Sequence, residues 1–159
     1  MSYPPRLSAI IKLFSGLNDA EKRETLIAYA DHASAQEPRE GEQFHLEDTR
    51  KDEECTDTVG LFLHIDEEGR SHFRVTLGSQ VQTLTRAMSS ILCNGLDGIP
   101  PADILAIPSD FIPKIVGAEL VMIRSQTVYY LFTRIKGIVN IWLQRERAAT
   151  LQDEQPVNH

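Results

Sequence analysis

Residues 51–82 have the sequence KDEECTDTVGLFLHIDEEGRSHFRVTLGSQVQ, in which two short runs alternate apolar residues with other types. A period of two is typical of half-buried strands, and residues 66–69 separate the runs, so the pattern predicts a β-hairpin. If the three-residue loop 67–69 carries Gly69 in the left-handed conformation, Asp66 pairs with Arg70. This register sets apolar residues opposite one another on one face: Leu63 and Phe73, Leu61 and Val75, and Val59 and Leu77.

The open end of this hairpin carries the first candidate functional residue, Cys55, which is expected beside Gly78 and Ser79. Ser79 and Gln82 have the spacing of a capping box and predict that a helix begins there. Free amides and the positive end of the helix dipole favour a thiolate. Nearby carboxylates oppose this effect, because each favours the neutral thiol, and they leave the sign of the net shift open. They belong to Asp52, Glu53, Glu54 and Asp57.

Arg124 is the second candidate residue, and it stands at the predicted start of the last helix. The helix dipole disfavours a cation at that position, so another explanation is needed. Either the side chain is an exposed arginine without a role, or its planar donor group steadies a thiolate, a persulfide or a partner's carboxylate.

These features together resemble the SufE family. The resemblance lies in the order of elements over residues 5–145: a loop cysteine before a strand, a hairpin, a glycine at a helix start and a basic turn. The family's usual block is Gly-Cys-Gln-Ser-Gln-Val-Trp, and this chain keeps its cysteine and valine as Cys55 and Val59. Ser79 replaces an acidic residue that the family often carries, and Glu119 replaces a histidine. The matching basic turn is Arg124, Ser125 and Gln126, after Leu120.

The resemblance implies a sulfur carrier rather than a stand-alone enzyme. Cys55 would accept persulfide sulfur from a cysteine desulfurase, stimulate that enzyme, and pass the sulfur to an iron-sulfur scaffold, with Arg124 contacting the persulfide or the partner. No cofactor is expected in this chain, because pyridoxal phosphate would belong to the desulfurase and no lysine here lies in a recognisable phosphate site.

Two other classes of function stay open. A module that binds and regulates a desulfurase without carrying sulfur is favoured by the departures around Cys55, which would then be an inert loop cysteine. A thiol redox protein would need a resolving cysteine, and Cys93 is the only other cysteine. We expect Cys93 to be a small packing residue near a helix end. An iron-sulfur scaffold would need more ligands than two cysteines supply.

Length and charge limit the class of protein further. The 159 residues predict a single domain over residues 1–147 with a polar, disordered tail over 148–159. A net charge of −7 without a basic cluster argues against nucleic acid or an anionic membrane as the partner. No signal peptide or membrane span is predicted, and two cysteines are too few for a disulfide framework, so the cytoplasm is the expected location.

Helical periodicity predicts the other elements. A first helix begins after Pro4 and Pro5, and a second begins at a capping box formed by Asn18 and Glu21. Residues 34–54 are polar, and we expect a mobile arm there with a brief strand at Phe44 and Leu46. Short helical pieces follow residue 95, and the strongest periodicity marks a long final helix over residues 128–142. The predicted fold class is therefore α+β, a SufE/IscU-like antiparallel sheet of two or three strands packed against several helices.

His64 and His72 become cross-strand neighbours on the outer face in this register, next to Arg74. A structural zinc site normally has four ligands, and no further pair of Cys or His lies at a suitable spacing. We therefore expect exposed histidines and no metal.

Overall fold

The hairpin forms two neighbouring strands of the sheet in the computed structural model, which describes residues 3–51 and 57–154. The predicted register is confirmed, since Leu63 lies opposite Phe73. The Asp66 amide donates to the Arg70 carbonyl at 3.0 Å. Gly69 has a φ of +80°, the left-handed conformation that the three-residue loop requires. The turn chemistry of residues 66–70 thus sets the register of both strands.

The elements follow one another along the chain as short helices, a sheet and further helices. They are α1 (Pro5–Ser15), α2 (Asp19–Asp31), η1 (Ala33–Gln36), β1 (Leu46–Lys51), β2 (Thr58–Ile65), β3 (Ser71–Leu77), α3 (Thr83–Gly95), α4 (Pro101–Ala106), η2 (Ser109–Phe111), α5 (Ile112–Val116) and α6 (Ala118–Glu154). The capping box predicted at the start of α2 is confirmed, because the side chains of Asn18 and Glu21 each accept the other's backbone amide.

The sheet has three antiparallel strands in the order β1-β2-β3. The predicted brief strand is present as β1, but it covers Leu46–Lys51 and leaves Phe44 outside. Its pairing runs from Leu46 opposite Leu63 to Lys51 opposite Thr58. The length of β1 could not be predicted from its polar sequence. The strand depends on hydrogen bonds to β2 rather than on an apolar pattern of its own.

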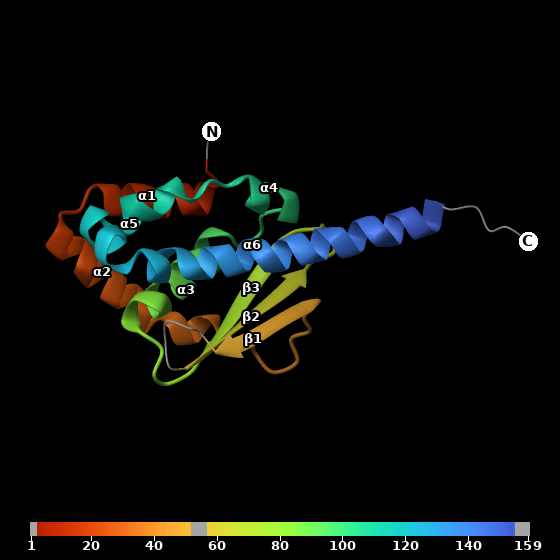
Figure 1. Ribbon diagram of the computed structural model, residues 1–159, viewed down its shortest axis with the longest axis horizontal. Helices are drawn as coiled ribbons and strands as arrows, with labels where there is room; N and C mark the ends of the chain where they lie inside the picture. The colour runs from red at the N-terminus through yellow and green to blue at the C-terminus, as the bar shows by residue number, and fades with distance from the viewer. Residues whose placement is uncertain (1–2, 52–56, 155–159) are drawn as a thin grey trace, which may run out of the picture.

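Helices cover the inner face of the sheet, as the α+β prediction required (Figure 1). The side chains that β2 and β3 turn inward are almost wholly buried against α3 and α6. They are Val59, Leu61, Leu63, Phe73 and Val75. Within residues 3–51 and 57–154, no helix combines the length and the hydropathy needed to cross a membrane.

The last helix is longer than its apolar stripe. α6 crosses the sheet and projects beyond it at its C-terminal end (Figure 1). The helix continues to Glu154, whereas the sequence predicted a disordered tail from residue 148; residues 155–159 lie outside the described part. Side chains over residues 144–152 are exposed, so this part of α6 forms without packing from the rest of the described chain.

Candidate functional site

The open end of the hairpin is closed by backbone hydrogen bonds. β1 ends at Lys51 opposite Thr58, and the Gly78 amide donates to the Thr58 carbonyl at 2.9 Å. The start of β2 and the end of β3 are therefore neighbours, as the register predicts. Cys55 lies outside the described residues, so its place beside this end stays a prediction.

Asp57 ties the start of β2 to the turn that precedes α3. Its Oδ1 accepts the Thr58 amide at 2.8 Å, and its Oδ2 accepts the Gln80 amide at 2.8 Å. The carboxylate lies so close to Gly78 that a Cβ at that position would be 2.1 Å from the carboxyl carbon, so any larger residue would displace it. The sequence grouped Asp57 with the other carboxylates around Cys55, but its oxygens are committed to backbone amides.

The capping box predicted at Ser79 is wrong, because α3 begins at Thr83 and has no side-chain cap. Ser79 instead lies in an exposed turn, where the Val81 amide donates to the Gly78 carbonyl at 3.2 Å. Arg86 donates to the carbonyls of both Gly78 and Val81. This turn carries Val81 into the core before the helix can begin.

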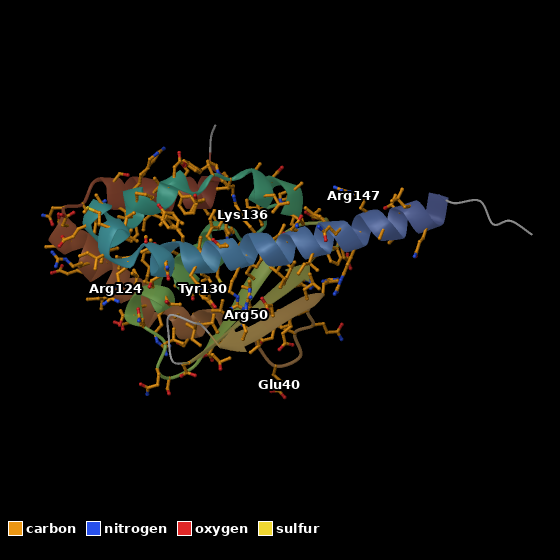
Figure 2. The ribbon with its side chains drawn as sticks, in the orientation of Figure 1. Glu40, Arg50, Arg124, Tyr130, Lys136 and Arg147 are labelled. Atoms are coloured by element: carbon orange, nitrogen blue, oxygen red, sulfur yellow. The ribbon has the colours of Figure 1, made fainter. Side chains whose placement is uncertain are left out.

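Arg124 interrupts α6, with φ −129° and ψ 37°, so the helical segment that carries the long apolar stripe begins after it. The side chain is exposed at the end of α6 nearest α2 (Figure 2). It lines a hollow of about 570 Å³ together with residues of α2 and the start of α3. Among the described residues, its guanidinium has no recorded hydrogen-bond or ion-pair partner. Arg124 and the start of α3 therefore share one surface.

Two exposed apolar residues precede Arg124 in the chain. Met122 is 85% exposed and Ile123 is 66% exposed, values that are unusual for such side chains in a folded domain. We name the surface beside Arg124 the α2–α6 face. It consists of Arg23, Ile27, Leu120, Ile123 and Arg124, which line two hollows that share Arg23 and Leu120.

Sequence reasoning missed Arg134, which is only 4% exposed. Its Nη1 donates to the Val59 carbonyl at 2.8 Å, and its Nη2 donates to the Asp48 carbonyl and lies 3.2 Å from an Asp48 carboxylate oxygen. The Tyr130 ring stacks near the guanidinium, 5.6 Å away. Arg134 therefore joins α6 to β1 and β2 at the open end. No clear signal existed in the sequence, because this arginine lies beside the apolar stripe of α6 and not within it.

Cys93 is a packing residue, as predicted, and is only 3% exposed. Burial raises the pKa of its thiol to about 12. The thiol is therefore neutral at physiological pH and shielded from any large reactant.

His64 and His72 are cross-strand neighbours, as predicted, with ring centroids 6.0 Å apart, but both are half-buried rather than exposed. His72 is enclosed because Asp97, in the loop after α3, lies 2.7 Å from its Nδ1, while Asp66 lies 2.7 Å from its Nε2. Burial is the largest influence on the pKa of His72 and lowers it, but hydrogen bonds to Asp66 and Asp97 outweigh burial and raise the pKa overall. This histidine holds the closed end of the hairpin against the helical layer.

Comparisons with known proteins all indicate the same family or the same fold. The family model of SufE, an Fe-S metabolism associated domain, matches residues 8–139. Two curated relatives, named as uncharacterized SufE-like proteins of two Mycobacterium tuberculosis strains, are each 30% identical over 137 residues, which cover 85% of this chain and 92% of the relative. The solution structure of a hypothetical protein from Thermus thermophilus is similar with a TM-score of 0.68 at 20% identity, covering 90% of this chain and 99% of that one. The structural similarity supports the fold.

Proposed function

The chain belongs to the SufE family of Fe-S metabolism associated proteins, and from this premise we propose that it is a sulfur acceptor and carrier. Cys55 takes sulfur from the persulfide of a pyridoxal-phosphate-dependent cysteine desulfurase and passes it to an iron-sulfur scaffold. Removing the persulfide frees the desulfurase for its next turnover, so the carrier also stimulates that enzyme.

The proposed transfer is an exchange at sulfur. The Cys55 thiolate attacks the outer sulfur of the donor persulfide and forms a new sulfur-sulfur bond. The donor's own sulfur-sulfur bond breaks, and its electron pair leaves with the donor cysteine as a thiolate. Cys55 then holds the persulfide, and a thiolate of the acceptor protein removes the outer sulfur in the same way. Neither step needs an oxidant or a reductant.

The burial of Cys93 is the observation that carries the assignment to Cys55. The chain has two cysteines, and a thiol that is 3% exposed with a pKa of about 12 is neither reachable nor ionised. Nucleophilic attack requires an accessible thiolate. The proposed sulfur-carrier function therefore depends on Cys55 alone.

The contacts of Asp57 at the start of β2 also support the proposal. It follows Cys55 by two positions and is fixed to the amides of Thr58 and Gln80. The chain is thus anchored immediately after the proposed acceptor. A fixed anchor lowers the conformational entropy that must be lost when a thiol is presented to a partner.

The α2–α6 face supports contact with the desulfurase. Exposed Ile27 and Ile123 supply apolar area, and Arg124 supplies a guanidinium that can bind a partner's carboxylate. Interfaces concentrate their binding energy in such apolar and arginine side chains. Arg124 then acts through partner binding rather than in the exchange itself.

The same face favours a second candidate function. All of its residues lie outside the Cys55 segment, so this surface can bind a desulfurase whether or not sulfur is transferred. In that case the chain regulates the desulfurase as a docking module.

Sulfur loading separates the two candidates. The protein is incubated with a cysteine desulfurase and free cysteine, and intact mass spectrometry counts added sulfur atoms while sulfide release reports desulfurase turnover. We expect wild type and Cys93→Ala to gain one sulfur, and Cys55→Ser to remain folded and gain none. If Cys55→Ser stimulates sulfide release as strongly as wild type, the docking module replaces the carrier.

Arg124 is tested in the same assay with a matched arginine. Arg124→Gln is expected to slow sulfur loading of Cys55, whereas Arg147→Gln, on the projecting part of α6, leaves it unchanged (Figure 2). Equal rates for the two variants would remove the α2–α6 face from the proposed interface.

A further inference from the structure

A second hollow lies away from the open end of the hairpin, at the β3 edge of the sheet. It has a volume of about 440 Å³ and is enclosed by β3, the end of α3 and the segment that connects η1 to β1. None of the residues that line it lines the hollow beside Arg124. The proposed sulfur transfer gives this region no role.

Cationic side chains predominate on its wall. Three arginines, Arg6, Arg39 and Arg74, face two carboxylates, those of Glu42 and Asp97. Both carboxylates are already paired, because Glu42 lies 3.3 Å from Arg74 Nε and Asp97 lies 3.0 Å from Arg6 Nη1. The wall therefore has positive charge in excess, and its anionic groups are engaged.

Two of the arginines retain free donors. Arg74 uses Nε for Glu42, and in the described part of the chain neither of its terminal nitrogens has a recorded partner. The Arg39 guanidinium attracts the Glu42 carboxylate electrostatically, but within residues 3–51 and 57–154 it donates no hydrogen bond to a side chain. A guanidinium with free terminal nitrogens matches the geometry of a carboxylate or a phosphoryl group.

The rest of the wall suits a small organic molecule. Phe44, Phe73 and Ala35 contribute apolar surface beside the imidazoles of His64 and His72. The volume falls within the range of about 300 to 1,000 Å³ that is usual for small-molecule sites. Apolar surface next to arginines with free terminal nitrogens is the pattern of a site that binds an anionic group attached to a carbon body.

We propose that this hollow binds a small organic anion, whose carboxylate or phosphoryl group lies between Arg39 and Arg74. Arg39 belongs to the connection between η1 and β1, and Arg74 belongs to β3. A ligand held by both would fasten that connection to the sheet. Binding is therefore expected to raise the Tm of the protein.

Titration with two probes tests the site. Citrate represents carboxylates and adenosine monophosphate represents phosphoryl compounds, each followed by calorimetry and thermal melts at constant ionic strength. We expect saturable one-to-one binding of at least one probe to wild type. Arg39→Gln and Arg74→Gln should each weaken it by about tenfold to a hundredfold, the loss of one charge-assisted hydrogen bond. Arg50→Gln, an exposed arginine of β1 outside the hollow, should bind as wild type does.

The results decide the proposal without relying on one variant. If Arg74→Gln fails to fold, the exposed Arg39→Gln still provides the test. The absence of saturable binding by both probes would overturn the site, as would equal loss in Arg50→Gln or full binding by Arg39→Gln. Sulfur loading of Cys55 is measured in parallel, and we expect Arg39→Gln to load normally, so a failure of the carrier function is distinguished from a failure of this site.

Discussion

An aspartate next to β2 holds each end of the β2–β3 hairpin. The two aspartates differ in how far along the sequence their hydrogen-bond partners lie. At the closed end, Asp66 Oδ1 accepts the amides of Glu68 and Arg70 at 2.9 and 3.0 Å, within the same turn. At the open end, Asp57 binds the Gln80 amide across 23 positions, and Arg134 binds the Val59 carbonyl across 75. The turn at the closed end is held by contacts within five residues, whereas the open end is held by contacts to distant parts of the chain.

This difference bears on the proposed function. A local turn can form before the rest of the domain is in place, because little chain entropy is lost in closing it. The open end requires the turn before α3 and the middle of α6 to be docked first. The end that presents the Cys55 segment is thus the end whose geometry depends on the whole fold.

Removing Arg134 is expected to have the largest effect on stability. Arg134→Met leaves the carbonyls of Val59 and Asp48 without their donor and should lower the free energy of unfolding by about 3 kcal/mol. Urea denaturation measures the change, with Arg50→Met on the exposed side of β1 as the control. A loss below about 1 kcal/mol would mean that α6 does not hold the open end and would break the comparison.

Gly69 provides the corresponding test at the closed end. Its φ of +80° is costly for any residue with a Cβ, so Gly69→Ala should cost about 1 to 2 kcal/mol in the same denaturation experiment. Glu67→Ala, in the same loop, should change stability by less than about 0.5 kcal/mol. Because the strain is local, we expect sulfur loading of Cys55 to be unchanged in the folded Gly69→Ala protein. Slower loading would show that the two ends are coupled.

Asp57 is expected to contribute less to stability than Gly69 but more to sulfur loading. Asp57→Ala removes the acceptor of two backbone amides, a loss comparable to that of a helix cap, about 1 kcal/mol. Gly78→Ala displaces the same carboxylate, so the double variant should cost less than the sum of the two single variants. Both single variants should slow sulfur loading while retaining the fold. Additive costs would show that Asp57 and Gly78 do not act as one contact.

The same contrast explains what could be predicted from the sequence. The hairpin register and the α2 capping box followed from residues close together in the chain, and both were confirmed. The start of α3 was misplaced at Ser79, because its position depends on contacts of Asp57 and Arg86 that the local pattern does not contain.

The candidate site was predicted only in outline for the same reason. Cys93 was predicted to be a small packing residue, and its burial confirms this. The burial of Arg134 depends on which helix face meets the polar edge of β1, which periodicity alone does not give. The position of Cys55 stays a prediction, as do the roles of Cys55 and Arg124.

The smallest expected effect is a pH dependence confined to the closed end. The pKa of His72 is raised, so the folded state holds its proton more tightly than the unfolded state. The stabilisation is complete below the ordinary value of 6.5 and is lost as pH rises through the raised pKa. Asp66 has the opposite sign: the hydrogen bond from His72 is the main cause that lowers its pKa to about 2, so its contribution is lost only as pH falls from about 4 toward that value.

Urea denaturation across the neutral range separates this effect from general titration. The wild type should lose stability between about pH 6 and pH 8, the range in which histidines titrate, and His72→Gln should abolish that slope. His32→Gln, an exposed histidine that directly follows α2, should retain it. Because His72 binds Asp66 and Asp97 but no group of the open end, sulfur loading should be insensitive to His72→Gln at any single pH. If loading changes in parallel with the stability slope, the closed end influences the open end, and the two must be treated as one cooperative unit.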